Sequence, residues 1–182
     1  MNITVYLGAS EGADPTLREA VAKFGTWIAR SGNSLVYGGS RSGLMGVLAE
    51  SVVTAGGEAT GVEPAFFLDI AVQYENLTRL IVTKDMTERK AKMIELGDAF
   101  VALPGGTGTL EEIAESLSNC NLGLQPGKCV FLNIDGYYEP MRVMLDAMTA
   151  AGYLHESELR GNAVFADSVE QLAAIIAEGE DK

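Results

Sequence analysis

Residues 103–112 read Leu103-Pro104-Gly105-Gly106-Thr107-Gly108-Thr109-Leu110-Glu111-Glu112. The apolar run at 99–103 predicts a buried strand of a parallel sheet. Beyond the segment, Ile113, Leu117 and Leu122 recur at helical spacing. The segment is therefore a strand-to-helix turn that contains three glycines and two threonines.

This turn has the composition of an anion-binding site. Glycines leave backbone N–H groups bare, and the start of a helix adds the positive end of its dipole, an arrangement that suits phosphate. Glu111 and Glu112 follow in the first turn of the expected helix. A phosphate site beside two carboxylates indicates a phosphorylated substrate, with chemistry performed nearby.

A purely structural interpretation of the same residues stays open. Thr109 and Glu112 have the spacing of a capping box, in which Glu112 would only accept a hydrogen bond from the backbone N–H of the cap residue. Acidic residues are favourable in any first helical turn, which by itself accounts for Glu111. The three glycines, the proline and the two threonines together exceed what a helix cap needs, so we favour function for the whole segment.

Composition favours one domain, which we expect to span residues 1–182. A chain of 182 residues with 47% hydrophobic content can bury a proper core. The formal net charge of −12 repels DNA and RNA, so no nucleic-acid polymer is expected as a partner. The single histidine, His155, excludes His-rich metal sites, and we expect neither a metal nor a cofactor.

The cysteines and the apolar segments predict a cytoplasmic protein. Cys120 and Cys129 belong to no CxxC or zinc spacing, so we interpret them as reduced thiols. Residues 1–6 lack the features of a signal peptide. No apolar run is long enough to span a membrane, so no membrane partner is expected.

Expected strands and helices alternate along the chain, which predicts an α/β fold with a doubly wound, mostly parallel, Rossmann-like sheet. The segment 65–77 is ambiguous and fits either a short helix or a lid. The expected strands are 3–7, 34–37, 58–62, 80–82, 99–103, 129–133 and 163–165, and Glu63-Pro64 is expected to break the third. The expected helices are 14–30, 44–53, 86–96, 110–122, 137–150 and 168–178, with the methionines of 137–150 filling the core.

Two further small-residue turns follow expected strands. Residues 37–46 include Gly38 and Gly39, and residues 8–12 include Ser10. The segment 37–46 is neither a Walker loop nor GxGxxG, and its glycines could serve helix–strand packing alone. Loops at the carboxyl ends of neighbouring parallel strands converge on one crevice, so we expect the Gly-rich turn 37–46 to face the same ligand as 103–112.

Arg89 and Lys90 lie in the first turn of the expected helix 86–96. Cations are unfavourable there because of the helix dipole, so a bound anion is one explanation for them. A solvated helix face with Glu88 and Glu95 as partners is the other.

Three segments together resemble the Lonely Guy (LOG) family, whose signature is PGGxGTxxE. They are Val36-Tyr37-Gly38-Gly39-Ser40-Arg41-Ser42-Gly43-Leu44-Met45-Gly46, Met86-Thr87-Glu88-Arg89-Lys90-Ala91-Lys92-Met93 and 98–112, and the likeness extends to Leu132-Asn133-Ile134-Asp135-Gly136-Tyr137-Tyr138. The resemblance implies a Rossmann-like homodimer that hydrolyses the N-glycosidic bond of adenine nucleoside 5′-monophosphates, best known for cytokinin riboside 5′-monophosphates. The products are the free base and ribose 5-phosphate. Relatives were long labelled lysine decarboxylases, but no lysine here lies in an evident pyridoxal phosphate site.

The resemblance also implies roles for individual residues. Arg89 and Glu112 match the catalytic pair, and residues 105–109 match the phosphate loop. The substrate-binding residues that we expect are Lys90, Gly105, Gly106, Thr107, Gly108, Thr109, Glu111, Ser118, Gly38, Gly39 and Ser10. The carboxylate would stabilise the positive charge that builds on the ribose, or would activate water.

Some positions differ from the family pattern. Thr87, Thr107 and Ser118-Asn119 replace residues common in the family, and Ala71 falls where many members have a glutamate that contacts the nucleotide. The altered positions concern the base pocket, so the preferred base is not identified by the resemblance.

Two other functions remain open from the sequence. A non-catalytic nucleotide or molybdenum-cofactor carrier of the same fold would fit an altered base pocket. An interaction protein with a vestigial site fits less well, because idle glycines reduce stability. We expect a homodimer whose interface uses the apolar stretch 66–72 and the helix 110–122.

Overall fold

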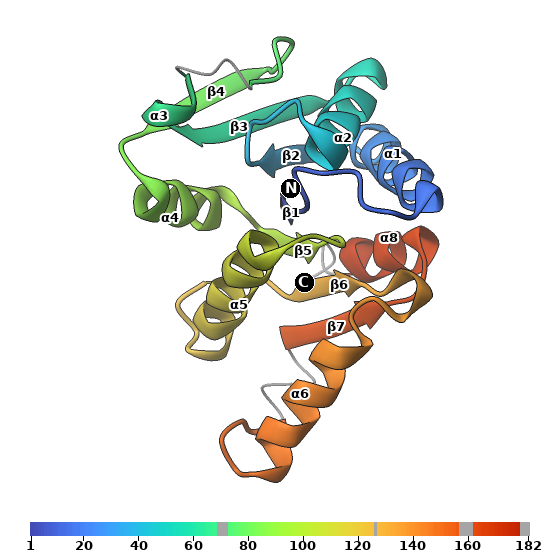
Figure 1. The fold of residues 1–182 in the computed structure, drawn as a ribbon, viewed down its shortest axis with the longest axis vertical. Coiled ribbons are helices and arrows are strands. Elements are labelled where there is room, and N and C mark those ends of the chain that lie inside the picture. The colour runs from blue at the N-terminus through green and yellow to red at the C-terminus, as the bar shows by residue number, and fades with distance from the viewer. Residues whose placement is uncertain (69–72, 126, 157–161, 179–182) are drawn as a thin grey trace.

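The computed structural model describes residues 1–68, 73–125, 127–156 and 162–178, and its centre is a seven-stranded sheet in the order β4-β3-β2-β1-β5-β6-β7 (Figure 1). All neighbouring strands pair in parallel. The strands are β1 (Asn2–Tyr6), β2 (Ser34–Tyr37), β3 (Glu58–Pro64), β4 (Arg79–Thr83), β5 (Ala99–Ala102), β6 (Cys129–Leu132) and β7 (Ala163–Ala166). The predicted α/β class with a doubly wound, Rossmann-like sheet is confirmed.

Helices cover both faces of this sheet. Figure 1 shows α1, α2 and α8 on one side, and α4, α5 and α6 on the other. The helices are α1 (Pro15–Arg30), α2 (Gly43–Thr54), α3 (Ala65–Leu68), α4 (Met86–Leu96), α5 (Thr107–Asn121), α6 (Glu139–Ala150) and α8 (Val169–Ala177), with a 3-10 turn at Ile134–Gly136. The ambiguous segment 65–77 thus begins with a short helix, and residues 69–72 lie outside the described part of the chain.

Alternation along the strands divides the core into two layers. In β1, Ile3 and Val5 pack beneath α1, α2 and α8, whereas Tyr6 packs in the cluster beneath α4, α5 and α6. In β5, Val101 and Phe100 divide between the same two clusters. This division follows because successive side chains of a strand point to opposite faces of the sheet.

The winding of the chain reverses between β1 and β5. The chain passes from β1 outward through β2 and β3 to the edge strand β4, and then returns to β5 on the other side of β1. At this reversal Gly8 N–H donates to the Pro104 carbonyl at 3.4 Å. In open parallel sheets a ligand crevice lies at the carboxyl ends of the strands, at such a reversal.

Two element boundaries differ from those expected, the start of α5 and the end of β3. Asp14 and Asp85 cap α1 and α4 through their carboxylates, as their positions predict. By contrast, α5 begins at Thr107, three residues earlier than expected, after the N-cap Gly106. The expected break of the third strand at Glu63-Pro64 is wrong, because β3 continues through both residues, which pair with Val82 and Thr83 of β4.

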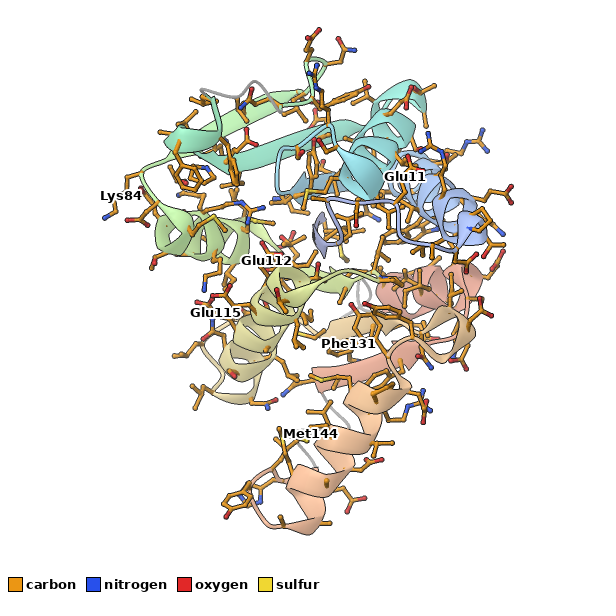
Figure 2. All side chains as sticks on the ribbon, viewed as in Figure 1. Glu11, Lys84, Glu112, Glu115, Phe131 and Met144 are labelled. Carbon is orange, nitrogen blue, oxygen red and sulfur yellow. The ribbon has the colours of Figure 1, made fainter. Side chains whose placement is uncertain are left out.

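The expected core packing of α6 is confirmed in part. Leu145 is buried and Met141 packs against the core cluster beneath α4, α5 and α6. By contrast, Val143, Met144 and Met148 are exposed, and Met144 is labelled on this helix in Figure 2. Leu122, expected on the apolar face of α5, lies just past the end of that helix and is also exposed. Helical spacing predicts which side chains share a face, but not whether another element covers that face.

Candidate active site

A cavity of about 600 Å³ lies at the carboxyl ends of β1, β2 and β3, beside the start of α5. Its size is ordinary for a small-molecule site. It is lined by Leu7, Gly8, Ala9, Ser10, Gly38, Ser40, Ser42, Met45, Glu63, Phe67, Met86, Arg89, Gly106, Thr107, Gly108, Thr109, Glu111 and Glu112. The Gly-rich turns 37–46 and 103–112 therefore meet at one crevice, as expected, and residues 8–10 after β1 join them.

The start of α5 is shaped as an anion site. The N-cap residue Gly106 provides no side chain to accept hydrogen bonds from the first helical N–H groups. These groups belong to Thr107, Gly108 and Thr109, all of which line the cavity. A Cβ placed on Gly106 or Gly108 would meet no protein atom within 4 Å, so their bare backbone borders open space. A phosphate can approach these N–H groups closely.

Arg89 and Glu112 form a buried ion pair inside the same cavity. The Nη1 of Arg89 lies 2.6 Å from Oε1 of Glu112, and both side chains are 7% exposed. The Nε of Arg89 donates to the Val62 carbonyl at 3.0 Å, which fixes the guanidinium between α4 and the end of β3. Figure 2 shows Glu112 at the end of α5 that faces α4.

This pair decides between the alternatives left open by the sequence. Glu112 bonds to Arg89 and the helix cap is Gly106, so the capping-box interpretation of Thr109 and Glu112 is wrong. Arg89 is buried and does not belong to a solvated face. Burial raises the pKa of the Glu112 carboxyl, although the charge of Arg89 opposes this effect.

Lys90 connects the two helices on the outer side of the pair. Its Nζ lies 2.7 Å from Glu111 and 2.9 Å from Glu115, and these carboxylates raise the pKa of the ammonium. Its partners are therefore acids of α5, not Glu88 and Glu95 of its own helix. A lysine held charged in this way is not a free amine of the kind that forms a Schiff base.

The Gly-rich turn before α5 is held by two tyrosines. Tyr137 donates its hydroxyl hydrogen to the Gly105 carbonyl at 2.5 Å, and Tyr138 donates to the Leu103 carbonyl at 2.8 Å. Gly105 itself lines a neighbouring cavity of about 530 Å³, together with Tyr137 and Asp135. These two hydrogen bonds tie the turn before α5 to the segment that follows β6.

The structure brings most of the expected site residues together. The cavity wall includes Arg89, Glu112 and seven expected binding residues, Ser10, Gly38, Gly106, Thr107, Gly108, Thr109 and Glu111. Lys90, Gly39, Gly105 and Ser118 are not part of that wall; Ser118 is exposed farther along α5. Ala71 lies outside the described residues.

Sequence reasoning missed Glu63. This residue of β3 lines the cavity and is 1% exposed, and its Oε2 has no hydrogen-bond partner among the described residues. Burial raises the pKa of its carboxyl. The available signal was an acid within an apolar strand next to the ambiguous segment 65–77, but Glu63-Pro64 was interpreted as a strand break.

Known proteins place the chain in a family. Residues 45–176 match the family model described as possible lysine decarboxylase. The chain is 44% identical over 154 residues to the cytokinin riboside 5′-monophosphate phosphoribohydrolase of Rhodococcoides fascians. This alignment covers 84% of this chain and 78% of that protein. The chain belongs to the Lonely Guy (LOG) family. The family resemblance of the sequence is thus confirmed.

Other relatives extend this LOG assignment. Cytokinin riboside 5′-monophosphate phosphoribohydrolase LOG7 of Arabidopsis thaliana is 36% identical over 152 residues, covering 84% of this chain and 70% of that one. The solved Moco carrier protein of Chlamydomonas reinhardtii superimposes with a TM-score of 0.75 at 22% identity, over 99% of this chain and 97% of that one. At that identity the likeness shows that the LOG-family chain and the carrier share a fold.

Within its described residues, the LOG-family chain has no group of three His, Cys, Asp or Glu side chains arranged to hold a metal ion. The polar groups of the cavity are instead a guanidinium, carboxylates, hydroxyls and backbone N–H groups. Such a set can bind a phosphate and assist proton transfer.

Proposed function

We propose that the protein hydrolyses the N-glycosidic bond of a purine nucleoside 5′-monophosphate, with adenine or an N6-modified adenine as the base. The products are the free base and ribose 5-phosphate. The names of the curated relatives support a phosphoribohydrolase. The observation that carries the proposal is the buried Arg89–Glu112 pair beside the uncapped start of α5, within one cavity.

The 5′-phosphate binds at the start of α5. The N–H groups of Thr107, Gly108 and Thr109 donate to its oxygens, and the helix dipole favours its negative charge. This attraction is local, because the chain as a whole carries a formal net charge of −12. Lys90 assists by holding Glu111 and Glu115, which keeps these carboxylates from turning toward the phosphate.

Glu112 acts on the sugar. Breaking the bond between C1′ and the base nitrogen builds positive charge on the ribose, and a carboxylate stabilises that charge and accepts the proton of the attacking water. A raised pKa suits this role, because a general base works best when its pKa lies near the working pH. Arg89 orients the carboxylate through the 2.6 Å contact and keeps it ionised.

A base-release assay tests this proposal. The protein is incubated with the 5′-monophosphates of adenosine, isopentenyladenosine, guanosine, cytidine and uridine, and free base and ribose 5-phosphate are measured. We expect release from the adenine nucleotides, and adenosine without its phosphate to be a much poorer substrate. Failure to release base from every monophosphate, in a preparation that is folded by circular dichroism, would refute the enzyme proposal.

The carrier alternative gives a different result in the same experiment. A carrier returns its nucleotide or molybdenum cofactor intact after tight binding, whereas a hydrolase returns two products. The similarity to the Moco carrier structures concerns the fold alone at 22% identity, so it adds no support for that alternative.

The active protein is a cytoplasmic homodimer in this proposal. Apolar side chains are exposed on α3, β4 and the starts of α4 and α5, namely Phe66, Leu80, Val82, Met86 and Leu110, and Met86 also lines the cavity. In this proposal a second copy covers these side chains and shields the cavity from water. The free thiols of Cys120 and Cys129, 4.0 Å apart, suit a reducing compartment. Light scattering tests the dimer, and a monomer at assay concentration would contradict it.

The described helices offer none that is both long and apolar enough to cross a membrane.

A further inference from the structure

Glu63 is a buried acid for which neither the fold nor the catalytic pair provides a use. It lies at the carboxyl end of β3, where it is 1% exposed, and its Oε2 has no partner among the described residues. The same carboxyl contributes to the wall of the 600 Å³ cavity. Burying a polar atom without a partner is costly, so a position of this kind indicates a group that meets a ligand.

The backbone beside Glu63 leaves space for it. Gly39 has a φ of +82°, and a Cβ there would lie 3.3 Å from Cβ of Glu63. The preceding residue, Gly38, makes the equivalent space for Arg89. Two consecutive glycines thus accommodate two ionisable side chains that line one cavity, Glu63 and Arg89.

The position of Glu63 relative to the phosphate site matches the length of a mononucleotide. The phosphate site follows β5, and Glu63 ends β3, which is the third strand away in the sheet. Three strand spacings amount to about 14 Å. Glu112 and Arg89 act between these two points, where the ribose would lie. A nucleotide with its phosphate on α5 therefore extends its base toward Glu63.

The wall around Glu63 has the character of a base pocket. Met45, Phe67 and Met86 line the cavity along with Glu63 and supply an aromatic ring and two thioethers. Such side chains pack well against the faces of a planar heterocycle. The carboxyl of Glu63 is the acidic group among them, so it would meet the edge of the base.

Glu112 alone leaves the hydrolysis chemically incomplete. When the C1′–N bond breaks, its electron pair stays on the base, and a base that departs as an anion is a poor leaving group. Protonation of a ring nitrogen by an acid removes this difficulty, as it does for the leaving oxygen in other glycosidases. Glu112, held ionised by Arg89, accepts the proton of water and cannot also be that acid.

We propose that Glu63 is the general acid that protonates the departing base. The Glu63 carboxyl gives its proton to a ring nitrogen of the base while the C1′–N bond breaks, and becomes a carboxylate. Water adds to C1′ and passes its proton to Glu112. Solvent then returns a proton to Glu63 and removes one from Glu112, so that nucleotide and water give neutral base and ribose 5-phosphate. This assignment rests on the proposed hydrolase function.

The surroundings of Glu63 keep it protonated. Burial raises the pKa of its carboxyl, and this effect exceeds the lowering by a hydrogen bond with Gln73 and by the charge of Arg89. Tyr37 of β2, whose hydroxyl is buried without a partner, stays neutral because burial and Glu63 raise its pKa. The remaining ionisable groups of the cavity wall are Glu111 and Glu112 of α5, whose negative charges also favour a protonated neighbour.

The test compares wild type with Glu63→Gln on two kinds of substrate. One is the best nucleotide from the base-release assay, and the other is 4-nitrophenyl ribofuranoside 5-phosphate, whose leaving group departs as a stable anion. We expect kcat on the nucleotide to fall by about 100-fold or more, with KM changed by less than about three-fold. The fall on the nitrophenyl substrate should be less than about five-fold, because that group needs no acid.

Controls separate this role from structural damage. Glu58→Gln changes an exposed acid at the other end of the same strand and should behave as wild type. The thermal unfolding temperature of Glu63→Gln should not fall, since an uncharged amide replaces a buried carboxyl. A raised KM with unchanged kcat, or equal losses on both substrates, would overturn the general-acid assignment.

A pH profile of kcat on the nucleotide gives a second readout. Wild-type kcat should fall at high pH as Glu63 loses its proton, and the residual kcat of Glu63→Gln should lack that fall. Identical high-pH behaviour would overturn the assignment even if the nitrophenyl substrate is not accepted. Absence of base release by wild type would instead refute the hydrolase proposal, so the two failures are distinguishable.

Discussion

Gly38 lies so close to Arg89 that a Cβ at position 38 would be 2.2 Å from Nη2 of the guanidinium. The other near atoms belong to the flexible end of Met45, at 3.3 Å. The second Gly-rich turn therefore shapes the Arg89–Glu112 pair directly, by leaving the space into which Arg89 reaches. Helix–strand packing was one use that the sequence left open for this glycine, and the structure adds room for a guanidinium.

Gly38→Ala should impair catalysis more than folding. The added methyl group would push the guanidinium away from Glu112, whereas the affected atoms are ends of flexible side chains that can move. A misplacement of about 1 Å can lower kcat by about 100-fold. We expect a fall of that order, with a loss of no more than about 2 kcal/mol in the free energy of unfolding. Steady-state kinetics and urea titration measure the two effects, and wild-type kcat would contradict the assigned contact.

Glu112→Gln should abolish turnover while nucleotide binding persists. The amide keeps the size of the side chain and can still accept a hydrogen bond from Arg89, but it cannot take a proton from water. We expect a fall in kcat of about 100-fold to 10,000-fold. Calorimetric titration with the nucleotide, or with ribose 5-phosphate, should give a dissociation constant near that of wild type. Normal turnover would remove Glu112 from the mechanism.

Gly108→Ala separates ligand binding from stability. A Cβ at this position meets no protein atom within 4 Å, and alanine is the better helix former by about 1 kcal/mol. The folded chain should therefore be as stable as wild type or slightly more stable. The methyl group would instead occupy space beside the N–H groups of α5, so KM should rise by about ten-fold or more. An unchanged KM would place the phosphate elsewhere.

The sequence was sufficient for the sheet and for most of the site because both depend on local patterns. Apolar runs before small-residue turns predicted the strands, and the spacing from Arg89 to Glu112 could be matched to a family signature. The convergence of the loops followed from the rule for parallel sheets. The cavity that unites Ser10, Gly38 and Gly108 is the direct result of that topology.

What sequence reasoning missed depends on contacts between distant elements. Glu63 is buried beside Gly39, which lies far from it in the chain. The exposure of Met144 on α6 likewise depends on which neighbours are present. The sequence offered Glu88 and Glu95 as possible partners of Lys90, which lie on its own helix. Its partners in the structure, Glu111 and Glu115, lie on α5.

The acid limb of the pH profile should lie above the ordinary range of a glutamate. Burial raises the pKa of Glu112 above the usual 4.5, and the base must be ionised to act. Activity should therefore fall as pH decreases through this raised pKa. The substrate phosphate also ionises, and this is a separate effect on activity. Measuring kcat at saturating nucleotide reduces that effect. An acid limb at or below 4.5 would contradict the raised pKa.

The same shift makes a prediction about stability. Folded Glu112 holds its proton more tightly than the unfolded chain does, so its protonation stabilises the fold. That contribution is complete below the unfolded pKa and is lost as pH rises through the folded pKa. The free energy of unfolding of wild type should therefore decrease over that window relative to Glu112→Gln, as urea titrations at several pH values would reveal. An increase over the same window would show that the ion pair with Arg89 outweighs burial.

Tyr6 and Ser116 attach α5, the helix that carries Glu112, to the sheet. The hydroxyl of Tyr6 on β1 lies 2.9 Å from that of Ser116 on α5, and the contact is buried. Ser116 follows Glu112 by one helical turn, so this contact fixes the face of α5 that carries the carboxylate. Tyr6→Phe leaves the Ser116 hydroxyl buried without that partner, which should lower the free energy of unfolding by about 1–3 kcal/mol.

A double-mutant cycle identifies this contact as the cause. Adding Ser116→Ala to Tyr6→Phe removes the orphaned hydroxyl, so the double variant should be more stable than the sum of the single losses predicts, by about 1 kcal/mol. Tyr153→Phe is the matched control, because Tyr153 is 88% exposed and its variant should lie within about 0.5 kcal/mol of wild type. Strict additivity of the two single losses in urea titrations would show that the hydroxyls do not interact in solution.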